Sequence, residues 1–104
     1  MFMSNTETFP GKNILACHGM VSGSTVRAKH VGRDFMAGLK NIVGGELVGY
    51  TELLNESRNE AISRMQAQAR DMGGNAIVNV RFSTSTVAAG ASEIYVYGTA
   101  VTVE

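Results

Sequence analysis

The hydrophobic pattern of this chain predicts strands at both ends and helices in the middle. Residues 13–21 hold a short apolar run between turn-forming residues, which is typical of a strand. The tripeptide Ser22-Gly23-Ser24 predicts a turn, and residues 25–28 then predict a short second strand. Residues 1–12 are polar and are interpreted as a partly ordered N-terminal arm. The chain is therefore expected to enter its fold through two strands.

Two helices are predicted next, each ending at a glycine pair. Over residues 31–43 the apolar positions repeat on one face with a 3.6-residue period, and Gly44-Gly45 follows. A longer helix covers residues 46–72 or 48–72 and ends at Gly73-Gly74, because glycine accepts the left-handed C-cap conformation. Glu60 and Arg64 are spaced to form an i,i+4 ion pair on it. The inward stripe of this helix is expected to be Leu54, Ala61, Ile62, Met65, Ala69 and Met72.

The C-terminal part returns to β structure. Residues 76–82 alternate as on a half-buried strand, with Ala76, Val78, Val80 and Phe82 on one side. Residues 83–92 are rich in Ser, Thr, Ala and Gly and predict a mobile loop, and residues 93–103 predict a last strand with Gly98 as a bulge or close approach. The order β-β-α-α-β-β indicates an α+β fold with a layer of helices on one sheet, in a single domain over residues 1–104.

Composition adds an expectation of self-assembly. A chain of 104 residues can bury a modest core, yet only 17% of its residues are charged, against about 25% in typical domains. Such a surface often has area to cover with a partner. Nine basic residues balance nine acidic ones, so the chain lacks the positive excess typical of nucleic-acid binders.

Cysteine usage and the N-terminus favour the cytoplasm. The lone Cys17 excludes an intrachain disulfide framework, as suits a reducing compartment. No signal-peptide pattern or membrane-length apolar run is visible, although Met1-Phe2 before Met3 leaves two possible starts.

The soft metal-ligand candidates are Cys17, His18 and His30, without a CxxC or HxxxH motif. Neighbouring strand residues point to opposite faces, so Cys17 and His18 are not expected to chelate one ion within a chain. One alternative is a metal site shared around a symmetric ring, and the other is a buried Cys17 with surface histidines. No catalytic residue is assigned, because Cys17 and His18 lack an orienting third group and the glutamates at 52, 56 and 60 suit a solvated helix face.

Two further groups of residues suggest contacts between subunits. A basic cluster, offset by Asp34, is formed by Arg27, Lys29, Arg33 and Lys40. It predicts either an anion or nucleic-acid site, or an ion pair of Arg33 with Asp34 of a neighbouring subunit. Tyr95 and Tyr97 share one face of the last strand. We interpret them as an interface, since aromatic residues are enriched in interface cores, with a ligand pocket as the alternative.

Several short motifs occur together in a characteristic order. They are Gly11-Lys12, Val21-Ser22-Gly23, Arg33-Asp34-Phe35, Ile42-Val43-Gly44-Gly45, Glu52-Leu53, Gly73-Gly74-Asn75-Ala76 and Gly98-Thr99-Ala100-Val101. In this order and spacing the chain resembles the YbjQ-like family of small bacterial proteins. Gly74 and Asn79 depart from the pattern, which typically has Ala and Gly at these two positions.

The resemblance implies a small β/α domain, related in shape to the dodecin subunit, that assembles into a ring-like pentamer. It also brings a heavy-metal-binding label without a settled activity. We therefore expect a non-enzymatic cytoplasmic homopentamer with a structural or small-ligand-binding role. The alternative is a metal-ion-binding module whose ligands are shared between subunits. No other cofactor and no membrane partner are expected.

Overall fold

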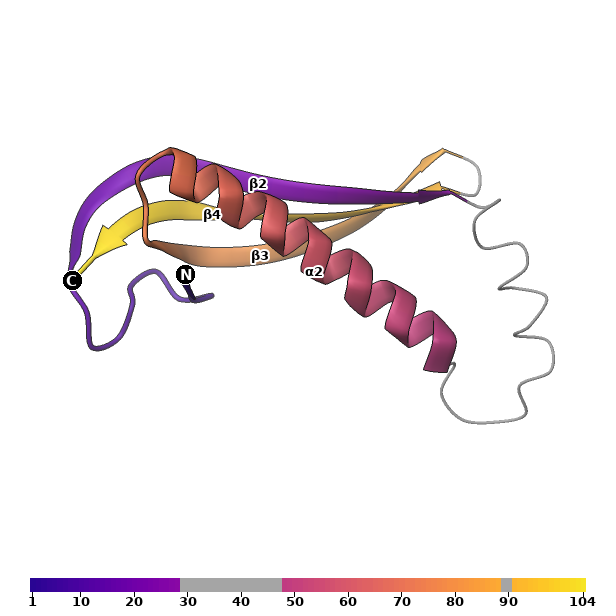
Figure 1. The fold of residues 1–104 in the computed structure, drawn as a ribbon, viewed down its shortest axis with the longest axis horizontal. Helices are drawn as coiled ribbons and strands as arrows, with labels where there is room; N and C mark the ends of the chain where they lie inside the picture. Colours follow the sequence, from indigo (N-terminus) through magenta and orange to yellow (C-terminus); the bar gives the residue numbers. More distant parts are fainter. Residues whose placement is uncertain (29–47, 89–90) are drawn as a thin grey trace.

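The computed structural model describes residues 1–28, 48–88 and 91–104 and shows one helix packed on one sheet. The sheet has the strand order β1-β3-β4-β2, with only β1 and β3 parallel. Helix α2 lies across one face of it (Figure 1). The elements are β1 (Phe2–Met3), β2 (Ile14–Ala28), α2 (Val48–Asp71), β3 (Ala76–Ala88) and β4 (Ala91–Val103). The predicted α+β class is confirmed, whereas the first predicted helix lies outside the described residues.

The predicted turn at Ser22-Gly23-Ser24 is wrong, because this tripeptide lies inside the continuous strand β2. Gly23 is used for close packing instead of chain reversal. A Cβ atom at this position would lie 2.1 Å from the carbonyl oxygen of Ala61 and 2.7 Å from the backbone nitrogen of Met65. Glycine therefore lets the helix backbone approach the strand backbone directly.

The predicted loop over residues 83–92 is also wrong. Most of it forms the far ends of β3 and β4, where Ser83 pairs with Tyr95 and Ser85 pairs with Glu93. The Ser and Thr content suggested a loop, but alternating Thr residues also fit a pleated strand once a partner strand pairs with them. The sheet therefore extends well past the predicted end of the third strand.

The main core lies under the C-terminal two-thirds of α2. Ser57, Ala61, Met65 and Ala69 recur every fourth residue and are fully buried. They face the sheet residues Val21, Ile77, Ile94, Val96 and Ala100, while Leu54 and Ile62 are half-buried beside them. Met72 was predicted in this stripe but is 36% exposed, because it follows the last helical residue, Asp71.

A second, smaller cluster lies on the opposite face of the sheet. Ala76, Val78, Val101 and Val103 pack there beneath Phe9. The simple alternation that placed Val80 with Val78 is wrong, since Asn79 and Val80 both lie opposite Gly98 and form a β-bulge. The bulge moves Val80 to the α2 side of the sheet.

Two residues make this bulge possible. Asn79 has a φ of 54°, in the left-handed region that asparagine tolerates better than most residues. A Cβ atom on Gly98 would come within 2.7 Å of Ile77 Cγ2, which confirms the predicted close approach at Gly98.

The end of α2 matches its predicted glycine cap. Gly73 has a φ of 92°, its N–H donates to the carbonyl of Arg70 at 2.9 Å, and the N–H of Gly74 donates to the carbonyl of Ala69 at 2.9 Å. This pair of bonds is a Schellman motif, which satisfies two helix-terminal carbonyls. The other pair, Gly44-Gly45, lies outside the described residues.

Candidate functional site

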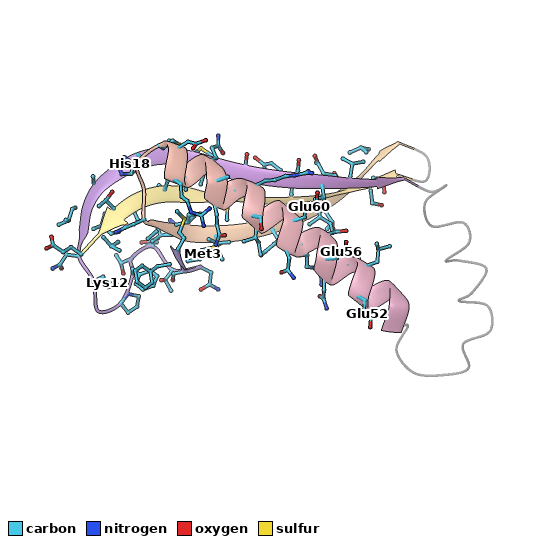
Figure 2. The ribbon with its side chains drawn as sticks, in the orientation of Figure 1. Met3, Lys12, His18, Glu52, Glu56 and Glu60 are labelled. Carbon is cyan, nitrogen blue, oxygen red and sulfur yellow. The ribbon has the colours of Figure 1, made fainter. Side chains whose placement is uncertain are left out.

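His18 occupies a defined position beside the end of α2 (Figure 2). The strand register shifts between Cys17 and Gly19, so His18 has no direct partner residue in β4 and its ring is re-aimed by the bulge. Its Nε2 lies 2.7 Å from Thr102 Oγ1, and that hydroxyl in turn donates to the carbonyl of Gly73 at 3.3 Å. The hydroxyl of Thr102 has one hydrogen and donates it to Gly73, so it can only accept from His18. In the neutral imidazole the proton therefore lies on Nε2, and the lone pair of Nδ1 stays available.

Cys17 does not join His18. It pairs with Val101, whose side chain belongs to the cluster on the face opposite α2, whereas His18 bonds toward the end of the helix. The thiol is exposed, so the interpretation of Cys17 as a small buried hydrophobe is wrong. Within residues 1–28, 48–88 and 91–104, no three side chains among His, Cys, Asp and Glu gather closely enough to hold a metal ion. His30 lies outside these ranges.

Tyr95 and Tyr97 form a stacked pair on the sheet face away from α2. Their ring centroids are 5.6 Å apart at an interplanar angle of 29°. Tyr95 lies between Ser24 and Ser83, and Tyr97 lies beside Ser22 on its β2 side. The small neighbours leave both half-buried rings accessible, as either an interface or a ligand surface requires.

The outer edge of β2 is closed in its middle by side chains from α2. The backbone N–H of Ser22 donates to Gln68 Oε1 at 2.8 Å, and the carbonyl of Ser24 accepts from Arg64 Nη1 at 2.5 Å. Arg64 also pairs with Glu60 at 2.6 Å, as its i,i+4 spacing predicted. Gln68 and Arg64 thus occupy backbone groups that another strand would use.

The outer edge of β3 is covered over only part of its length in the described structure. The N–H of Ser4 donates to the carbonyl of Ile77 at 2.9 Å, and the N–H of Val80 donates to the carbonyl of Ser4 at 3.0 Å. The guanidinium of Arg81 continues this contact by donating to the carbonyl of Asn5 at 2.7 Å. Beyond Arg81, the described residues provide no strand on this side of β3.

The predicted basic cluster is largely untested by the structure. Lys29, Arg33 and Lys40 lie outside the described residues, as does Asp34, and the side chain of Arg27 is not described. Glu52 and Glu56 are exposed on α2, at the end of the helix away from His18 (Figure 2). The intersubunit ion pair of Arg33 and Asp34 stays a prediction.

Sequence reasoning missed the residues that position this region. Thr102 was not connected to His18, because 84 residues separate them in the chain and only strand pairing brings them together. Gln68 and Arg64 carried a weak signal, namely two long polar side chains at i,i+4 beside the buried stripe of a helix. That spacing alone cannot say that they reach a strand edge.

A family profile described as "Putative heavy-metal-binding" matches residues 1–104. The chain belongs to the YbjQ-like family. It is 66% identical over 104 residues to a UPF0145 protein of Hahella chejuensis, covering 100% of both chains. It is 65% identical over 95 residues to a UPF0145 protein of Acinetobacter baylyi, covering 91% of this chain and 88% of the relative. The description names metal binding and no enzymatic activity.

A solved structure supports the YbjQ-like fold. A protein of unknown function from the DUF74 family of Pediococcus pentosaceus aligns with a TM-score of 0.64 at 15% identity, covering 100% of this chain and 98% of that one. At this identity the likeness concerns the fold alone. No helix in the described part of the chain is long and apolar enough to cross a membrane.

Proposed function

We propose that this YbjQ-like protein is a non-enzymatic cytoplasmic subunit of a ring-like homopentamer with a structural or small-ligand-binding role. The observation that carries the proposal is the incomplete cover of the sheet within residues 1–28, 48–88 and 91–104. In this part of the chain α2 packs on one face of the sheet and covers only part of its length (Figure 1).

The surface of the subunit supports the same proposal. Large apolar side chains are exposed on both long outer strands, including Val26 on β2 and Phe82 and Val87 on β3. The half-buried Tyr95–Tyr97 stack adds aromatic surface on the face away from α2. Surface of this kind is better stabilised against another copy than in water.

Light scattering coupled to size exclusion at micromolar concentration tests the proposal. A pentamer would give about five times the subunit mass of 11.1 kDa. A monomer at that mass would overturn it, and a different stable oligomer would overturn the pentamer while leaving assembly in place.

A second candidate function is metal binding through ligands shared between subunits. The specific observation in its favour is the pair of hydrogen bonds that links His18 to Thr102 and Thr102 to Gly73. Metal-ligating histidines usually donate their other ring N–H to a fixed acceptor of this kind. His18 Nδ1 would then be the ligand atom. Since the described part of one subunit offers no cluster of three ligands, neighbouring copies would have to supply the others.

Elemental analysis of the protein purified without an affinity tag, followed by calorimetric titration with Zn²⁺, tests this candidate. His18→Ala is expected to abolish binding, and Thr102→Val to weaken it about tenfold by removing the hydroxyl that holds the ring. Cys17→Ser and His30→Ala identify further ligands. Binding that survives all three ligand changes together would exclude this site.

A further inference from the structure

We propose that subunits join by strand addition, with the outer edge of β3 in one copy taking the outer edge of β2 in the next, and that Gln68 and Arg64 form a latch on that edge. The inference rests on the proposed homo-oligomer and names its interface. The partner is a second copy of this chain, presenting the residues around Ser22 and Ser24. The observations are the two edges, the side-chain bonds that close one of them, and the charges beside each.

The open segment of β3 begins where the N-terminal residues stop covering it. Val80 bonds outward to Ser4, and outward-facing backbone groups alternate along a strand, so those of Phe82, Thr84 and Thr86 face the side that the described residues leave without a strand. Residues 82–86 contain no Pro, Lys or bulge, the usual devices that protect an edge strand. Phe82 at the start of this segment is 49% exposed, and Val87 just beyond its end is 52% exposed.

In the matching segment of β2, the outward backbone groups are already hydrogen-bonded by side chains of α2. Ser22 N–H and Ser24 C=O are two residues apart, which is the spacing at which a neighbouring strand bonds an edge. Gln68 and Arg64 supply side-chain partners at these two positions. Replacing them with backbone groups of an incoming strand conserves the number of hydrogen bonds, so the exchange costs little net free energy.

The side-chain pattern selects the direction of pairing. β2 and β3 are both antiparallel to β4 and therefore run the same way. Ser24 pairs with Tyr95 and so does Ser83, which places both serines on the sheet face away from α2. Parallel addition sets Ser24 beside Ser83 or Ser85 and keeps every α2 helix on one side of a continuous sheet. Antiparallel addition of β2 to β3 would put neighbouring helices on opposite sides.

Charge favours this head-to-tail contact over a two-fold one. Glu52, Glu56 and Glu60 form an i,i+4 row with Arg64 and Gln68, on the flank of α2 that reaches the β2 edge. Arg58 bonds Asn55 and lies on the opposite flank of α2, the flank on which Gln66 bonds Met3 of β1. The acidic flank of one copy then meets the flank that carries Arg58 in the next, and complementary charges of this kind fix partner and register. Head-to-tail contacts close into a ring when the rotation between neighbouring copies closes, as the proposed pentamer requires.

Two substitutions at Thr84, one to proline and one to valine, test the β3 edge. Thr84→Pro removes the outward N–H but leaves the ladder to β4, whereas the control Thr84→Val keeps that N–H in a residue of the same shape. We expect Thr84→Pro to weaken assembly at least tenfold by light scattering on dilution, with Thr84→Val like the original protein and circular dichroism unchanged in both. If the original protein assembles and folded Thr84→Pro assembles equally well, this interface is wrong and the homo-oligomer stands. A monomeric original protein overturns both.

Disulfide trapping tests the pairing without relying on a proline. In a Cys17→Ser background, Ser24→Cys combined with Ser83→Cys or Ser85→Cys should give a ladder of cross-linked species on a non-reducing gel. Each single variant should stay uncross-linked. Efficient dimers from Thr84→Cys alone would instead show two β3 edges meeting across a two-fold axis and would overturn the head-to-tail arrangement.

The latch is tested by the rate of subunit exchange between two fluorescently labelled populations. Gln68→Ala frees the N–H of Ser22 for an incoming strand and is expected to change exchange at least threefold. Gln66→Ala is the matched control, because Gln66 lies on the same helix and bonds Met3 on the other flank. Equal exchange rates for the two variants would show that Gln68 is not a latch. The interface itself is tested separately by the disulfide cross-linking.

Discussion

The face of the sheet beneath α2 and the outer edge of β3 belong to the same sheet but differ in how completely other residues cover them. Under the helix, Val96 and Ile77 are fully buried, and Gly23 brings strand and helix backbones into contact. Along the outer edge of β3, Phe82, which pairs with Val96, and Val87 near the end of the strand are half exposed, and the outward backbone groups from Phe82 onward have no strand partner in the described structure. The core beneath α2 is complete within one subunit, whereas we propose that a second copy covers the outer edge of β3.

A pair of methionines gives the largest expected contrast between these regions. Met65 is fully buried in the core, and Met20 is 75% exposed on β2. Met65→Ala should lower the free energy of unfolding by about 3 kcal/mol through lost burial and a residual cavity. Met20→Ala should change it by less than about 0.5 kcal/mol. Urea denaturation at one protein concentration measures both, and equal losses would mean that the core boundary is misplaced.

A pair of glycines tests the close contact of helix and strand. Gly23→Ala should cost about 2–3 kcal/mol, because the added carbon meets the carbonyl of Ala61 and the backbone must separate. Gly11→Ala meets nothing within 4 Å but has a φ of 83°, so it should cost only about 1 kcal/mol of backbone strain. Thermal unfolding compares the two, and a Gly23→Ala protein as stable as the original would contradict the contact.

Phe82 separates assembly from folding. Because the ring is about half exposed, Phe82→Thr should lower the unfolding free energy of the subunit by less than about 1.5 kcal/mol. It should weaken assembly roughly tenfold, equivalent to about 1.4 kcal/mol per contact. Light scattering over a dilution series measures the second effect. Leu15→Thr, an exposed apolar position at the other end of β2, is the control and should assemble normally.

The smallest expected effect belongs to the ion pair of Glu60 and Arg64. Both side chains are substantially exposed, so Glu60→Gln should cost only about 0.3–0.5 kcal/mol, and less at high salt. Chemical denaturation at low and high salt provides the measurement. A loss above about 1.5 kcal/mol would show that Glu60 holds Arg64 on the β2 edge more firmly than a surface pair can.

Much of the architecture could be predicted from local pattern. The long helix, its cap at Gly73, the buried positions Ala61, Met65 and Ala69 and the close approach at Gly98 all follow from periodicity and glycine chemistry. The mistakes have a common cause. Gly23 looked like a turn residue and residues 83–92 looked like a loop, because sequence reports which conformations a residue permits and does not report which partner packs against it.

For the candidate sites too, some residues could be identified from the sequence, whereas their contacts could not. Sequence alone identified His18, Cys17, Tyr95 and Tyr97 as the residues worth examining, and it placed the two tyrosines on one face, since strand periodicity fixes that. Only the tertiary structure joined His18 to Thr102, turned Cys17 toward solvent, and brought α2 side chains onto the edge of β2. These are contacts between segments far apart in the chain, and their geometry depends on bulges and helix placement that no local pattern encodes.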